Sequence, residues 1–196
     1  MRYLLFTTLL FFSVQSFAAN VGKTAPAFSL KGHDNKTYSL KDYSGKYVVL
    51  EWLNHGCPFV RKHYDSQNMQ NLQKEFVAKG VVWLSIISSA EGKQGHVDPA
   101  GAKVDIKENG AFASAVLLDP SGKVGRLYGA KTTPQMYIVN PKGTLVYNGA
   151  IDSIASADED DIKNADNYVK ENLSLLLSGK EAKYKKTRPY GCSVKY

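Results

Sequence analysis

Cys57 is the residue of this sequence whose surroundings best suit chemistry. It follows an apolar run at 47–53 and a short turn, and Pro58 comes directly after it. Proline is favoured in the first turn of a helix, so this pattern predicts Cys57 at a helix N-cap. There the free N–H groups and the helix dipole stabilise an anion, which for cysteine is the thiolate. We expect His55, Arg61 and Lys62 to add positive charge. The alternative is an inert cysteine at a strand–helix junction.

The first eighteen residues predict export. Arg2 supplies a short positive segment, a nearly continuous apolar run follows, and Ser16 and Ala18 put small residues at the cleavage positions. We therefore expect 1–18 to be a signal peptide, with a mature chain in the periplasm of a Gram-negative source or otherwise secreted. The alternative is an uncleaved anchor, for which the run is short. We expect no membrane span after cleavage.

Cys192 is the second of only two cysteines. An even number in an exported chain indicates one disulfide, because extracytoplasmic compartments are oxidising. Two roles are open for a Cys57–Cys192 bond. It is either reversible, with Cys192 resolving a bond formed at Cys57, or a permanent structural link.

Positive charge gathers at the C-terminal end. The chain carries a net charge of +7, and 179–196 holds six lysines or arginines against Glu181 alone. The remainder is almost neutral. This distribution argues against nucleic-acid binding, which uses a folded basic face. The length suits one domain. We expect that domain at 19–178 and a basic tail carrying Cys192 at 179–196.

The hydrophobic patterns predict an α/β protein. Segments that are apolar on both faces indicate central strands of a parallel sheet, and an alternating pair around a turn indicates an antiparallel hairpin. The expected strands are 47–53, 81–87, 115–118, 136–139 and 144–147, and the expected helices are 58–79, 99–108 and 161–178.

The strand, turn, Cys-Pro and helix resemble the thioredoxin-fold redoxins, which include the alkyl hydroperoxide reductase/thiol-specific antioxidant family. The opening pattern G-x-x-A-P-x-F-x-L also fits, with Gly22, Pro26, Phe28 and Leu30. The resemblance covers about 21–150. It implies a thioredoxin-like fold with a central mixed sheet flanked by helices. It also implies protein or small-molecule thiols and disulfides as partners, an external thiol as electron donor, and no cofactor.

Two further site elements follow from this resemblance. Glu51, six residues before Cys57, matches the buried acid that relays protons in thioredoxins, and burial raises a carboxyl pKa toward neutrality. Alternatively, Glu51 reaches solvent or pairs with a lysine. Thr133-Pro134 resembles the Thr–cis-Pro turn that faces the active cysteine and pairs with an extended substrate. An ordinary trans turn is the alternative.

The sequence also departs from both family patterns. Val60 stands where thioredoxins have the second cysteine of Cys-x-x-Cys, so Cys57 has no local partner. Peroxiredoxins have P-x-x-x-[T/S]-x-x-C, and here Leu50 and Asn54 stand at those positions. Pro134 replaces their late arginine. Asn54 could still donate a hydrogen bond to a peroxide oxygen, so thiol peroxidase activity remains an alternative.

Histidines near the cysteine suggest a metal site as a further alternative. His55, Cys57 and His63 would be the ligands, as in a copper-binding chaperone. Their spacing matches no recognised ligand motif. We therefore expect no metal, with His55 beside the thiolate and His63 on a helix surface.

These observations predict an exported thiol oxidoreductase. Cys57 is its nucleophile toward a disulfide or a peroxide, and Cys192 or an outside thiol resolves the product. The alternative from another class is a non-enzymatic binding module with a structural Cys57–Cys192 disulfide.

Overall fold

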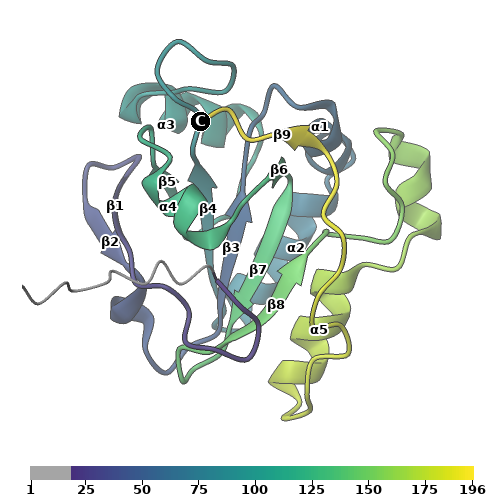
Figure 1. The fold of residues 1–196 in the computed structure, drawn as a ribbon. Coiled ribbons are helices and arrows are strands. Elements are labelled where there is room, and N and C mark those ends of the chain that lie inside the picture. Colours follow the sequence, from purple (N-terminus) through teal and green to yellow (C-terminus); the bar gives the residue numbers. More distant parts are fainter. Residues whose placement is uncertain (1–18) are drawn as a thin grey trace, which may run out of the picture.

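The computed structural model describes residues 19–196 (Figure 1). The predicted signal peptide lies outside the described residues. Seven strands form one mixed sheet in the order β2-β1-β5-β4-β3-β7-β8, and β6 and β9 form a separate pair. The strands are β1 (Ser29–Gly32), β2 (Thr37–Ser39), β3 (Val48–Trp52), β4 (Val82–Ile87), β5 (Ala115–Leu118), β6 (Thr132–Thr133), β7 (Gln135–Val139), β8 (Leu145–Gly149) and β9 (Cys192–Ser193).

Helices cover both faces of this sheet. They are α1 (Pro58–Asp65), α2 (Asn68–Ala78), α3 (Pro99–Glu108), α4 (Lys123–Tyr128) and α5 (Tyr168–Leu177), with short 3-10 helices η1 (Leu40–Tyr43) and η2 (Glu159–Asn164). Strands β3, β4 and β5 are parallel, and β7 runs antiparallel to β3. This is the thioredoxin-like α/β arrangement that the sequence predicted. Across 19–196, the helices are all too short or too polar to cross a membrane.

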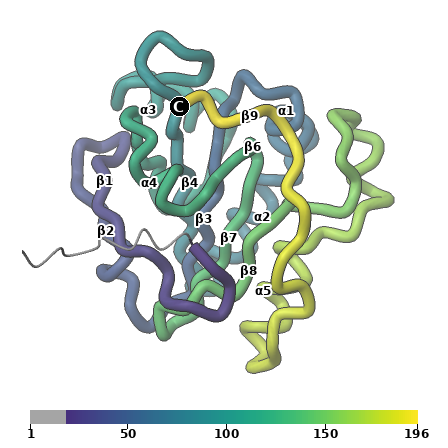
Figure 2. Tube along the Cα trace, in the orientation of Figure 1, coloured from purple at the N-terminus to yellow at the C-terminus, as the bar shows by residue number. Residues whose placement is uncertain are grey.

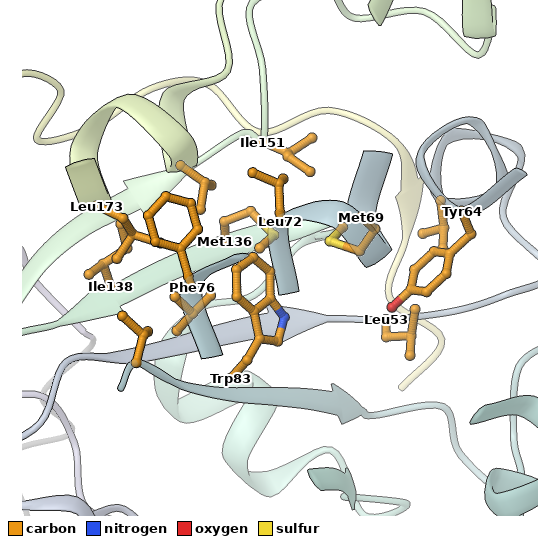
Figure 3. Packing of buried hydrophobic residues seen from close by; sticks show 14 of the residues in the cluster. Leu53, Tyr64, Met69, Leu72, Phe76, Trp83, Met136, Ile138, Ile151 and Leu173 are labelled. Atoms are coloured by element: carbon orange, nitrogen blue, oxygen red, sulfur yellow. The ribbon is translucent and has the colours of Figure 1, made fainter. Parts of the chain in front are cut away.

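Two hydrophobic layers lie on opposite faces of the sheet. On one face, α2 and α5 pack against the central strands, and Phe76 and Leu173 meet Trp83 in the layer (Figure 3). On the other face, α4 and the N-terminal segment cover Leu50 and Trp52. Because β3 is buried along its whole length, its C-terminal end is a rigid base for the turn that carries Cys57.

Two predicted helices are divided in the structure. The helix expected at 58–79 is two helices, because Gln67 adopts a left-handed conformation (φ 62°) between α1 and α2. The helix expected at 161–178 begins later, at Tyr168. There the Asn167 side chain caps the helix by accepting a hydrogen bond from the Lys170 amide. Before it the chain forms η2.

The basic tail at 179–196 packs along the domain rather than leaving it (Figure 2). It first follows β8, where the Asn148 amide donates to Lys185 and the Thr187 amide donates to Asn148. It then crosses the end of the sheet as β9, antiparallel to β6. Finally the Tyr196 hydroxyl donates to the Ala130 carbonyl at 2.7 Å.

Candidate active site

Cys57 occupies the N-cap of α1, as its Cys-Pro sequence predicted. The side chain is completely buried. Its sulfur donates a hydrogen bond to the carbonyl of Thr133 at 3.1 Å. The turn after β3 therefore brings the cysteine against the segment that precedes β7, which is a neighbour of β3 in the sheet.

Cys192 lies directly beside Cys57. The Cys192 amide donates to the Cys57 sulfur at 3.4 Å, and in the β6–β9 pair Cys192 is the register partner of Thr133. Both cysteines are free thiols in the structure. The fold thus brings together two cysteines that are 135 positions apart in the chain.

The two thiols differ in acidity. Burial raises the pKa of Cys57, but the Cys192 thiol, the Cys192 and Val60 amides and the Thr133 side chain stabilise the thiolate and outweigh it, so the pKa is lowered. Burial and the neighbouring Cys57 thiolate both raise the pKa of Cys192. Cys57 therefore ionises first.

Thr133 and Pro134 form the wall opposite Cys57. Their peptide bond is cis, as predicted. Gly191 passes so close to this wall that a Cβ on it would lie 2.0 Å from the Thr133 carbonyl oxygen. Gly191 also has a φ of +120°, which side-chain-bearing residues rarely adopt. Glycine is needed here for the tail to approach the wall.

Glu51 is buried on β3 and accepts four hydrogen bonds. They come from Tyr64, Gln73, Trp83 and Ser85 at 2.8–3.1 Å. The alternatives that Glu51 reaches solvent or pairs with a lysine are therefore wrong. Burial raises the pKa of Glu51, although the four donors oppose this rise. No hydrogen bond joins Glu51 to either cysteine in the described part of the chain.

Asn54 and His55 shape the turn rather than touch the sulfur. The Asn54 side chain accepts from the Gly56 amide at 2.9 Å and donates to the Gln94 carbonyl at 3.3 Å. His55 packs edge-on against Tyr64. Burial, with a smaller effect of the nearby Arg61, lowers the pKa of His55 to about 4. The expectation that His55 supplies positive charge at neutral pH is therefore wrong.

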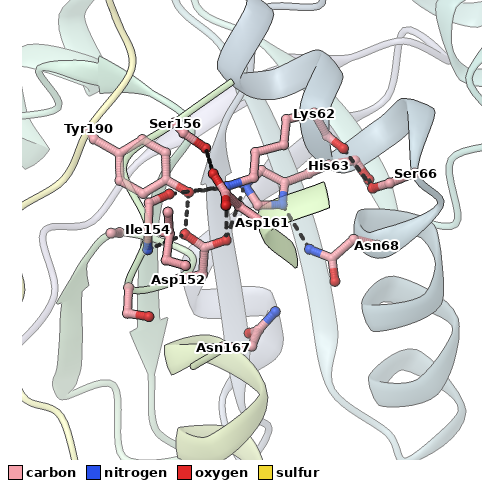
Figure 4. A network of polar contacts seen from close by, with 12 residues as sticks. Lys62, His63, Ser66, Asn68, Asp152, Ile154, Ser156, Asp161, Asn167 and Tyr190 are labelled. Atoms are coloured by element: carbon pink, nitrogen blue, oxygen red, sulfur yellow. Dashed lines mark hydrogen bonds and ion pairs between the residues drawn. The ribbon is translucent and has the colours of Figure 1, made fainter. Parts of the chain in front are cut away.

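The expectation that His63 lies on a helix surface is also wrong. His63 and Lys62 are fully buried on α1. The Lys62 ammonium lies 3.5 Å from the Asp152 carboxylate and donates to the Ile154 carbonyl at 3.0 Å, so it points away from Cys57. His63 contacts Tyr190 of the tail and Asn68 of α2 (Figure 4). Its two ring nitrogens are engaged, and in 19–196 no group of three ligand side chains gathers as a metal site would need.

Sequence reasoning missed this cluster around Asp152. A lysine and a histidine in one turn of a helix suggest a solvated face, and their partners lie far away in the chain. Tyr190, two residues before the second cysteine, is the one local signal that could have drawn attention to the tail.

Known proteins resemble this chain over most of its length. The Bacillus subtilis thioredoxin-like protein YneN is 28% identical over 134 residues, which are 68% of this chain and 74% of that protein. The structure of an uncharacterized conserved protein from Geobacillus kaustophilus matches with a TM-score of 0.76 and 25% identity, covering 90% of this chain and 92% of that one.

A third match is the exposed lipoprotein thioredoxin Etrx1 of Streptococcus pneumoniae. Its TM-score is 0.50 at 29% identity, covering 71% of this chain and 96% of that one. These matches, together with the paired thiols, support a thiol oxidoreductase in general terms. The model of the AhpC/TSA family matches residues 21–148, which is well over half of the chain. The chain therefore belongs to the AhpC/TSA family.

Proposed function

We propose that this chain is a thiol–disulfide oxidoreductase in which Cys57 and Cys192 act as a reversible pair. The observation that carries the proposal is the contact between the Cys192 amide and the Cys57 sulfur. Thiol–disulfide exchange needs an attacking thiolate and a second thiol within reach of the mixed disulfide. The lowered pKa of Cys57 and the nearby tail cysteine supply both.

The reaction proceeds in two exchanges. The Cys57 thiolate attacks one sulfur of a partner disulfide, which forms a mixed disulfide and releases the other partner sulfur as a thiolate. Cys192 then loses its proton and attacks the Cys57 sulfur, which gives the Cys57–Cys192 disulfide and releases the second partner thiolate. The partner gains two electrons from the two cysteines. An external thiol donor later reduces the pair by the reverse exchanges.

The raised pKa of Cys192 does not obstruct the second exchange. Burial raises this pKa most, and the hydrogen bond to Cys57 and the charge of the Cys57 thiolate raise it further. In the mixed disulfide the Cys57 sulfur carries no negative charge, so this repulsion is gone. We expect the pKa of Cys192 to fall at that step, when its thiolate is needed.

Thr133 and Pro134 are proposed to bind the partner's peptide segment. The β6 edge pairs with a two-residue strand of the tail in antiparallel register. Main-chain pairing of this kind recognises an extended segment with little dependence on its side chains. Asn54 and His55 are proposed to support the turn before Cys57, and Glu51 is proposed to hold a proton beneath it.

Trapping experiments test this function directly. We expect full-length Cys192→Ser to accumulate a mixed disulfide with a peptide disulfide, and Cys57→Ser to accumulate much less. In the wild type, peptide mapping without reductant should find a Cys57–Cys192 bond that opens and closes in a glutathione buffer. A bond that resists thiols at every ratio would instead identify a structural link and refute the proposal.

We also propose that the protein works outside the cytoplasm. The basis is the signal-peptide pattern at 1–18 and the similarity to an exposed lipoprotein thioredoxin. N-terminal sequencing of the protein from its native source tests this, and a mature chain that starts at Ala19 is expected. A retained Met1 would contradict cleavage.

A further inference from the structure

The tail that carries Cys192 covers the reactive cysteine. Cys57 has no exposed surface, and both Tyr190 and Cys192 pack against the hydrophobic cluster that contains it. Position 192 pairs with Thr133, and the Val194 amide donates to the Lys131 carbonyl at 3.0 Å. A partner segment cannot pair with the β6 edge while the tail occupies it.

A chain of hydrogen bonds holds this tail segment in place (Figure 4). The side-chain NH2 group of Asn68 donates to Nδ1 of His63 at 2.8 Å, which leaves the hydrogen of the neutral ring on Nε2. Nε2 then donates to the Tyr190 hydroxyl at 3.1 Å, and this hydroxyl donates to the Asp152 carboxylate. Among these four hydrogen-bonded residues, only Tyr190 belongs to the tail.

The surroundings allow the Tyr190 hydroxyl to be removed without disturbing its neighbours. Asp152 and Lys62 are both buried, and they balance each other's charge. The Tyr190 ring packs edge-on against Phe59. Loss of the hydroxyl alone would leave this ring packing intact, and Asp152 would keep the hydrogen bond from the Ile154 amide.

There is room beside the tail at this point. A cavity of about 560 Å³ borders Thr132, Asp152, Tyr190 and Gly191. It borders the tail residues just before β9 and one residue of β6, Thr132. Residues 187–191 of the tail therefore border open space on one side, and specific contacts hold them on the other.

We propose that residues 191–193 are a displaceable strand that occupies the partner's place on β6, and that Tyr190 is the latch that holds it. This inference rests on the proposed function. Tyr190 is a positioning residue, because it acts through Cys192. A closed latch favours the internal disulfide, and an open latch exposes Cys57 and the β6 edge to an extended, cysteine-bearing segment of another protein.

Full-length Tyr190→Phe tests both effects of the latch, which are stabilisation of the internal disulfide and shielding of Cys57 from a partner. A hydrogen bond to a charged group typically changes an equilibrium by roughly tenfold or more. The Cys57–Cys192 disulfide of this variant should therefore be roughly tenfold less favoured against glutathione, a shift of about 30 mV to a less negative potential. In the Cys192→Ser background, Tyr190→Phe should form a mixed disulfide with a peptide disulfide roughly tenfold faster.

Two further variants control this test. Tyr184→Phe removes a hydroxyl from the same tail that makes no hydrogen bond to the described latch residues, and it should leave potential and rate unchanged. Gly191→Ala should change both in the same direction as Tyr190→Phe, because its Cβ would meet the Thr133 carbonyl. It retains the Tyr190 hydroxyl and the groups that bond it, so it tests displacement of the strand by a different perturbation.

The outcomes distinguish this inference from the function on which it rests. A Tyr190→Phe protein with the potential and rate of the wild type would overturn the latch. A shifted potential with an unchanged rate toward the peptide disulfide would show that the tail does not stand in the partner's way, which also overturns the proposal. If Cys57 forms a mixed disulfide in none of the Cys192→Ser variants, the oxidoreductase function itself fails.

Discussion

Replacement of Glu51 by glutamine tests the ionisation of the carboxyl beneath the active site. Burial raises the pKa of Glu51 above its ordinary value of 4.5, and four hydrogen bonds only partly oppose this. The folded protein therefore holds this proton more tightly than the unfolded chain. The resulting stabilisation is complete below the unfolded pKa and is lost as the pH rises through the folded pKa.

The size of the effect follows from proton linkage. Between the two pKa values, the free energy of unfolding of the wild type should fall relative to that of Glu51→Gln by up to about 1.4 kcal/mol per pH unit. Glutamine keeps the shape of the side chain. Its oxygen can accept from Trp83 and Ser85, and its NH2 group can face the Tyr64 hydroxyl. At acidic pH the two proteins should therefore differ by only about 1 kcal/mol.

Urea unfolding of both proteins under reducing conditions, from about pH 4 to pH 8, measures this difference. Exposed Glu91 offers a matched control, because Glu91→Gln removes a carboxyl from a surface loop. The free energy of unfolding of this control, plotted against pH, should stay parallel to that of the wild type. If the Glu51→Gln curve is also parallel across this range, the carboxyl ionises normally, and the proposal that it holds a proton beneath Cys57 is wrong.

Three other substitutions test the site. Cys192→Ala should raise the pKa of Cys57, seen as a higher midpoint of alkylation rate against pH, since it removes the thiol that donates to Cys57; an unchanged midpoint would contradict this. Asn54→Ala should lower the free energy of unfolding by about 1–2 kcal/mol but leave that midpoint unchanged. Lys62→Met should lower the free energy of unfolding in urea by about 3–5 kcal/mol, because it leaves the buried Asp152 carboxylate without its partner. The double variant with Asp152→Asn should recover part of this loss.

Local sequence signals predicted the reactive half of the site. The apolar strand, the turn and Cys57-Pro58 each act through neighbouring residues, so the position of the cysteine at the helix N-cap followed from the sequence. Thr133-Pro134 was also recognisable, because the turn precedes a regular hairpin. The fold class followed from the order of these elements along the chain.

The other half depends on contacts between distant residues. Gln67 breaks the long helix by adopting a left-handed conformation, and neither a glycine nor a proline marks this position in the sequence. Lys62 and His63 are buried because Asp152 and Tyr190 reach them from two later segments. Nothing within one element could indicate this pairing. The sequence therefore predicted Cys192 of the tail as a partner for Cys57, but not the contacts through which Tyr190 holds the tail.

The antiparallel pairing of β6 and β9 constrains how this chain can vary. Backbone pairing leaves the side chain at Ser193 largely free, whereas the spacing from Tyr190 to Cys192 is fixed. One residue inserted or deleted between them would turn every later side chain to the opposite face of the strand. Cys192 would then point away from Cys57 even with every contacting residue retained. In proteins of this design, the length of the tail is under stronger constraint than its composition.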